Sequence, residues 1–238
     1  MGKGARLAIT LVLFVLALGG FGAGVRALLS SPQELSFTKG PNGQVNVAMQ
    51  TVGSFGSGPH PTWVSYLIEN PQGQWVHTTM FQVPTNTQVN VTIYQFDSGS
   101  PLRNQQIGQV TGTVDPATGK GPAVGDPSPA VLNGKPFSVI NSNDPNGNGV
   151  GHTFSIPTLG ISVPLYANAG TATLCAAAPC DPTSTAYVHN KVQFSFITPK
   201  GPGNYAWQCF VPCGLAWLFG NAGPMQTVGY MGGFMKVA

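Results

Sequence analysis

Hydrophobic and polar residues alternate with a period of two in short segments spread along the chain. The clearest is 88–94, in which Val89, Val91 and Ile93 are separated by more polar residues. Because side chains of a strand point alternately to opposite faces, this pattern is typical of a half-buried antiparallel strand. Related patterns predict further strands at 44–49, 62–69, 152–156, 161–165, 192–197, 205–208 and 234–237. No amphipathic helix is predicted after residue 30, so the fold class is an all-β sandwich of short strands with Greek-key-like connections.

Residues 98–150 interrupt this pattern. They are rich in Gly, Pro, Asp, Asn and Ser, and the run 144–149 reads D-P-N-G-N-G, which favours turns. A structureless loop of this length is unusual in a compact domain. We therefore keep two interpretations, an elaborate loop and a small β insertion.

The N-terminus predicts export. Residues 7–25 form an uncharged, largely apolar run of 19 residues, preceded by Lys3 and Arg6 and followed by Arg26. A helix of this length would reach about 28 Å, close to the hydrocarbon thickness of a bilayer. We expect residues 1–31 to be a membrane anchor with Lys3 and Arg6 on the inner side. The alternative is a signal peptide cleaved near residues 22–24. In both cases the domain lies on the extracytoplasmic side, at the membrane or secreted.

Charge is scarce in this chain. Only 7% of the residues are charged, whereas about 25% is usual in globular domains. Three of the ten basic residues precede residue 31, so the other seven balance the seven acidic ones. A neutral domain lacks the basic surface that nucleic acids require, and we exclude nucleic acid as a partner.

Two segments carry the most informative residues. Residues 151–163 read G-H-T-F-S-I-P-T-L-G-I-S-V, and residues 202–214 read P-G-N-Y-A-W-Q-C-F-V-P-C-G. Together they resemble the cupredoxin domain of cytochrome c oxidase subunit II, whose sequences read H-x-F-x-x-P-x-L-G and then P-G-x-Y-x-x-x-C-x-x-x-C-G-x-x-H. The resemblance covers about residues 75–97 and 150–238. It implies a cupredoxin-like domain over 32–238, with insertions at about 98–150 and 166–190.

The resemblance also implies a copper site, though a degenerate one. In the family, two thiolates and two imidazoles bind a pair of copper ions, completed by a methionine and a backbone carbonyl. The matching ligands here are His152, Cys209 and Cys213. Where the family has its second histidine stands Trp217, whose indole offers no lone pair to a metal.

The remaining ligands are less directly matched. Val211 stands where the family's backbone carbonyl ligand lies, and a carbonyl is present whatever the side chain. Met231 resembles the ligand methionine that leads into the last strand, and Met225 is a weaker candidate. No histidine follows residue 189, so His60, His77 and His189 are the possible substitutes for the missing imidazole.

Four cysteines in an exported chain normally pair. Cys175 and Cys180 close a short loop within the second insertion, and we expect a disulfide between them. For Cys209 and Cys213 three states remain open. They are copper thiolates, they form a second disulfide in metal-free protein, or one of them pairs with Cys175 or Cys180.

These features favour a membrane-anchored, subunit II-like component of a haem-copper terminal oxidase or a related respiratory complex. It would assist the other subunits structurally or by electron transfer, and copper is its possible cofactor. A second interpretation is a stand-alone exported copper protein that uses His152, Cys209, Cys213 and Met231. A third is a metal-free sandwich for assembly or adhesion. No motif of an enzyme acting alone is present, so any catalysis would belong to a partner subunit.

Overall fold

The computed structural model describes residues 2–29, 32–58, 60–99, 101–144, 149–168, 174–213 and 223–238. The chain divides into two compact units, residues 1–32 and 33–238. The first contains helix α1 (Lys3–Leu29), in which Leu11, Phe14 and Phe21 are exposed. Among the described residues, no helix is long and apolar enough to cross a membrane.

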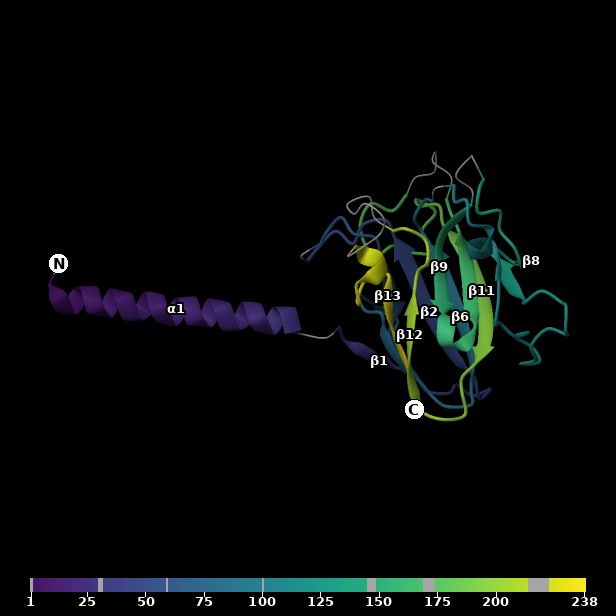
Figure 1. The fold of residues 1–238 in the computed structure, drawn as a ribbon, viewed down its shortest axis with the longest axis horizontal. Coiled ribbons are helices and arrows are strands. Elements are labelled where there is room, and N and C mark those ends of the chain that lie inside the picture. Colours follow the sequence, from purple (N-terminus) through teal and green to yellow (C-terminus); the bar gives the residue numbers. More distant parts are fainter. Residues whose placement is uncertain are drawn as a thin grey trace. The chain divides into compact units, whose positions relative to one another are not determined.

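The second unit consists of two stacked sheets (Figure 1), which confirms the predicted all-β sandwich. The six-stranded sheet has the order β1-β5-β13-β12-β9-β10, and the seven-stranded sheet has the order β4-β3-β2-β6-β11-β7-β8. The strands of the first are β1 (Glu34–Ser36), β5 (Met80–Val83), β13 (Gly232–Val237), β12 (Gly203–Gln208), β9 (Val150–Ile156) and β10 (Ile161–Tyr166). Those of the second are β4 (Trp75–Val76), β3 (Ser65–Glu69), β2 (Val45–Val52), β6 (Gln88–Gln95), β11 (Asn190–Ile197), β7 (Ala130–Leu132) and β8 (Lys135–Phe137).

The core lies between the two sheets. In β6, alternate residues are buried, as the period of two predicts. Trp207 of β12 fills the centre, with its ring centroid 5.0 Å from those of Tyr66 and Phe154. Its indole N–H donates to the Thr79 carbonyl at 3.0 Å, so the buried polar atom is satisfied. A side chain at Gly233 would collide with that same carbonyl, which explains the glycine there.

The 98–150 segment contains two strands of its own and is a small β insertion. It contains the 3₁₀ turn η1 (Gln105–Gly108), and β7 later in the segment joins the seven-stranded sheet by pairing with β11. Short bridges connect Thr111 to Ser162 and Val114 to Ser195. The insertion is therefore fastened to both sheets.

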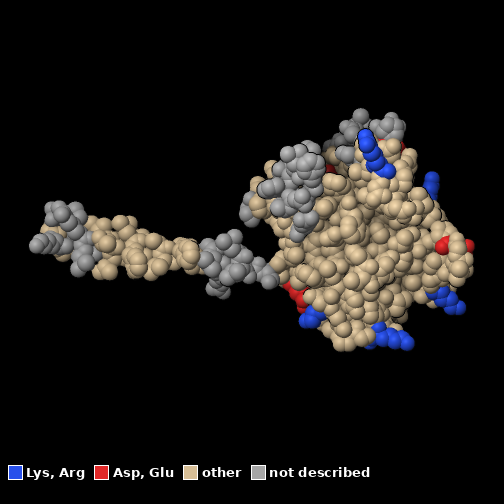
Figure 2. All heavy atoms as spheres, in the orientation of Figure 1, with Lys and Arg blue, Asp and Glu red and all other residues tan. Residues whose placement is uncertain are grey.

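Several strand boundaries differ from the sequence-based expectation. β2 continues to Val52 rather than ending at residue 49, and β9, β11, β12 and β13 each begin two residues earlier than expected. β3 begins at Ser65 rather than at residue 62, because Trp63 leaves the strand and stacks on His60 with ring centroids 3.7 Å apart. β1 was not predicted, since its three residues are too few to display a period. Figure 2 shows the scarcity of charge on one face, where Lys, Arg, Asp and Glu lie mainly towards the rim.

Candidate metal centre

The candidate centre forms where β9 and β12 come together. These strands pair at Ser155 and Gln208. Beyond that pair, contacts through side-chain atoms connect the two segments. The Thr153 N–H donates to Cys209 Sγ at 3.4 Å, and the Phe210 N–H donates to Thr153 Oγ1 at 2.8 Å. These contacts hold the segment after β12 against the strand that carries His152.

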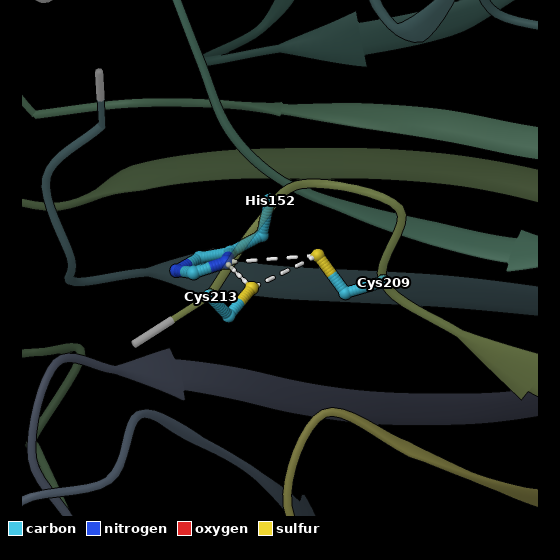
Figure 3. A group of neighbouring side chains, drawn as sticks. All are labelled: His152, Cys209 and Cys213. Atoms are coloured by element: carbon cyan, nitrogen blue, oxygen red, sulfur yellow. Dashed lines mark hydrogen bonds between the residues drawn. The ribbon is translucent and has the colours of Figure 1, made fainter. Parts of the chain in front are cut away.

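His152, Cys209 and Cys213 converge within the domain (Figure 3). The His152 Nδ1 atom lies 3.2 Å from Cys213 Sγ and 3.8 Å from Cys209 Sγ, and the two sulfurs are 3.3 Å apart. All three residues are buried, with exposed fractions of 3%, 0% and 3% over the whole residue. The geometry thus brings together the three ligands that the sequence motifs predicted.

The turn between the two cysteines is ordered by Val211. Its N–H donates to Cys209 Sγ at 3.4 Å. Its carbonyl oxygen lies 3.0 Å from Cys213 Sγ and 3.6 Å from Cys209 Sγ. A backbone oxygen therefore faces both sulfurs, at the position expected from the resemblance.

Asp97 is the residue that sequence reasoning missed. It follows β6 in the seven-stranded sheet, and its Oδ2 lies 2.9 Å from His152 Nε2. Its Oδ1 accepts from the Ser98 N–H at 2.7 Å, which fixes the carboxylate. The one available signal was its position, a carboxylate directly after an alternating strand. Nothing in the sequence indicates that a histidine 55 residues away is its partner.

The electrostatics of the site favour separated charges. Burial opposes a charged imidazole, but the hydrogen bonds with Asp97 and Cys209 outweigh it and raise the pKa of His152 to about 9. Burial likewise opposes ionisation of Asp97, yet its hydrogen bond to His152 leaves the carboxyl pKa below its usual value. Both pKa shifts favour an ion pair between His152 and Asp97, whose Nε2 and Oδ2 atoms lie 2.9 Å apart.

The two thiols differ in acidity. Burial opposes the Cys209 thiolate, but hydrogen bonds from Cys213 and His152 hold the pKa of Cys209 well below its ordinary value. The pKa of Cys213 is raised by its hydrogen bond to Cys209 and by burial. One thiolate thus lies beside one thiol. These groups in turn raise the pKa of Tyr66, although burial of Tyr66 is the larger cause.

The predicted methionine ligands are not part of the His/Cys cluster that the structure shows. Met231 is buried directly before β13, and its carbonyl accepts from the Cys209 N–H at 2.8 Å. Met225 lies in the short 3₁₀ turn η4 (Pro224–Gln226) and is partly buried against the core. Trp217 lies outside the described residues. Within the described part of the chain, the His/Cys cluster contains His152, Cys209 and Cys213 but no further histidine.

The cysteines divide into two pairs. Cys175 and Cys180 form the predicted disulfide. Cys209 and Cys213 are free and buried in the structure. Their pairing in oxidised, metal-free protein stays a prediction.

The donor set fits a soft or borderline metal ion. The candidate ligand atoms of His152, Cys209 and Cys213 lie within 4.8 Å of one another, so a single ion could contact all three. Thiolate and imidazole donors suit copper, and two sulfurs with one nitrogen favour Cu(I). In comparisons with known proteins, no family model, curated protein or solved structure matches this chain.

Proposed function

We propose that this chain is a cupredoxin-like, subunit II-type component of a respiratory membrane complex. Copper would be held by His152, Cys209 and Cys213, with Met231 as a further ligand. The observation that carries the proposal is the convergence of these three buried side chains from two distant motifs, in the order that the copper family has them. Trp217 in place of the second histidine makes the site a degenerate member of that type.

In this proposal the buried position of the three ligands would limit access of water to copper. Copper, when bound, would supply one-electron redox chemistry. Ligands carried by a hydrogen-bonded sandwich would move little between the two oxidation states. The Val211 N–H orients Cys209, while Asp97 directs His152 Nδ1 towards the sulfurs.

The partners that we propose for this protein are inferred from its apolar N-terminal segment and from its few charged residues. In this proposal the apolar N-terminal segment would attach the domain to the membrane, although no described helix meets the length and apolarity of a membrane span. The domain would lie on the extracytoplasmic side and contact the other subunits of the complex there. Residues 33–238 contain only seven carboxylate side chains, too few for the acidic surface patch that would attract cytochrome c by charge. Quinol-oxidising members of the family have lost copper ligands and keep the domain as a structural cap. Trp217 in place of the second histidine resembles that branch, so a chain without copper would have this structural role instead of electron transfer.

Copper content tests the proposal. The full chain is purified in detergent, reduced, loaded anaerobically with Cu(I) and washed. We expect stoichiometric copper in the wild type and its loss in a Cys209→Ser, Cys213→Ser variant. The matched control is Cys175→Ser, Cys180→Ser, which removes two cysteines outside the site and should keep copper. Equal retention by both variants would exclude the site.

A second function, stand-alone copper handling, is favoured by one observation. The described ligands are two sulfurs and one nitrogen, a set suited to Cu(I) rather than to both oxidation states. Purification from native membranes distinguishes the two functions. Haem-bearing subunits that co-purify support the respiratory complex, whereas a copper-loaded chain alone supports copper handling.

A further inference from the structure

A groove of about 700 Å³ lies on the outer face of the seven-stranded sheet, and it has no part in the copper proposal. Its floor consists of side chains that point away from the core. In one row across the sheet, Asn46 of β2 is paired with Asn90 of β6, which is paired with Ser195 of β11. In the next row, Thr92 of β6 is paired with Gln193 of β11. We call this the amide groove, with the floor Asn46, Asn90, Thr92, Gln193 and Ser195.

Hydrogen bonds hold the floor in one arrangement. The Asn90 amide nitrogen donates to Gln44 Oε1 at 2.9 Å and to Asn46 Oδ1 at 3.0 Å. The Ser195 hydroxyl donates to Asn90 Oδ1 at 2.8 Å. Asn90 is thus fully engaged, and its neighbours are oriented before any ligand arrives, which lowers the entropic cost of binding.

Two residues of the floor, Asn46 and Gln193, keep polar groups available for a ligand. Asn46 is exposed, and within the described part of the chain its amide nitrogen has no acceptor, although its oxygen is bonded to Asn90. Gln193 donates to Thr92 at 3.4 Å, a long and weak bond that a ligand could replace. A side-chain amide carries both hydrogen-bond donors and an acceptor, so it can pair with a ligand group such as a hydroxyl, which also donates and accepts.

The walls are apolar and almost without charge. Phe37, Pro71, Pro116, Pro129 and Val131 contribute to them. Among the described lining residues, Glu69 alone has a charged side chain. A volume in the range of small-molecule sites, apolar walls and a few fixed polar groups are the usual features of a binding site.

We propose that the amide groove binds a neutral glycan. Sugar hydroxyls both donate and accept, as the amides do, and the C–H faces of sugar rings would pack on Phe37 and the prolines. None of the lining residues that the structure describes is cationic, which disfavours phosphate and nucleic acid. The groove lies over a sheet face, so an added peptide strand would find no free strand edge there. The inference does not depend on copper.

Calorimetry tests this with three neutral probes and the full chain in detergent: cellohexaose, mannohexaose and chitohexaose. We expect saturable binding of at least one. Asn46→Ala should weaken it about fivefold to tenfold, which is the effect of losing one or two hydrogen bonds. Val131→Trp should abolish it, because Val131 is paired with Gln193 and a larger side chain there would fill the groove.

The matched control is Asn204→Ala. Asn204 is also an exposed strand amide, but it belongs to β12 in the other sheet. It should bind as the wild type does. An unchanged thermal transition in each variant shows that folding is intact. Failure of all three probes, or equal binding by Val131→Trp, would overturn the proposal. Copper retention is measured on the same samples, so failure here is distinguishable from failure of the proposed function.

Discussion

Asp97 and His152 connect the two sheets of the sandwich at the candidate metal centre. Asp97 follows β6 of the seven-stranded sheet, His152 belongs to β9 of the six-stranded sheet, and Oδ2 and Nε2 meet at 2.9 Å. The exposed fraction is 4% for the histidine side chain and 19% for the aspartate. Because Nε2 is occupied in this way, Nδ1 is the nitrogen that faces the sulfurs.

Removing the Asp97 charge should weaken copper binding. Asp97→Asn keeps the shape of the side chain but changes its hydrogen bonding and its charge. Loss of such an outer partner typically costs about 10–100-fold in metal affinity. Competition with a Cu(I) chelator measures the change. Asp126→Asn, an exposed aspartate in the insertion, is the control. An affinity equal to that of the wild type would show that Asp97 does not position His152.

The two free thiols should ionise separately. With the pKa of Cys209 well below 9.0 and that of Cys213 well above it, reduced metal-free protein contains one thiolate at neutral pH. The ultraviolet absorbance of the thiolate should therefore persist below the ordinary thiol pKa and disappear in Cys209→Ser. The reciprocal variant, Cys213→Ser, should retain it. Absorbance that appears only near pH 9 would contradict the assignment.

The Cys175–Cys180 disulfide should stabilise the domain without affecting copper. It closes a loop over a separation of five residues, for which the chain-entropy relation gives roughly 2 kcal/mol. The Cys175→Ala, Cys180→Ala variant should lose about that free energy of unfolding, measured with denaturant. The Gln50 side chain still bonds to both backbone groups of Cys180, which limits the rearrangement. A loss of copper in this variant would contradict the separation of the two cysteine pairs.

Protonation of His77 should lower the free energy of unfolding as the pH decreases. Its ring stacks on Phe55 with centroids 3.6 Å apart, and its Nε2 lies 2.8 Å from Ser65 Oγ. Burial lowers the pKa of His77 from 6.5, so the unfolded chain binds a proton more readily than the folded one. This contribution to stability is present above pH 6.5 and is lost as the pH falls towards the folded-state pKa.

Denaturant unfolding at several pH values measures this effect. His77→Gln should flatten the dependence below pH 6.5. His189, whose pKa is lowered mainly by burial, supplies part of the slope that remains. The control is His60→Gln, at an exposed histidine stacked on Trp63. An unchanged slope in His77→Gln would exclude the histidine as the cause.

The sequence predicts those features of the fold and of the candidate site that depend on residues close together in the chain. The strand at 88–94 is predicted correctly because only one of its two faces packs against the core, so every second residue is hydrophobic and buried. His152, Cys209 and Cys213 were found because their motifs are local. Asp97 was not, because its pairing depends on how the two sheets stack. The amide groove was missed for the same reason, since Asn46, Asn90 and Ser195 become one row only through strand register.

The candidate centre has consequences for how the protein matures. His152 and Cys209 are 57 residues apart, and Asp97 is a further 55 residues before His152. Groups so distant in the chain meet late, because the loops between them must close first. An ion that arrives early would find single sulfurs and imidazoles rather than three converging ligands. If the proposed function holds, copper would therefore enter after the sandwich has formed, and a chelator present during folding would delay loading without changing the residues that receive the ion.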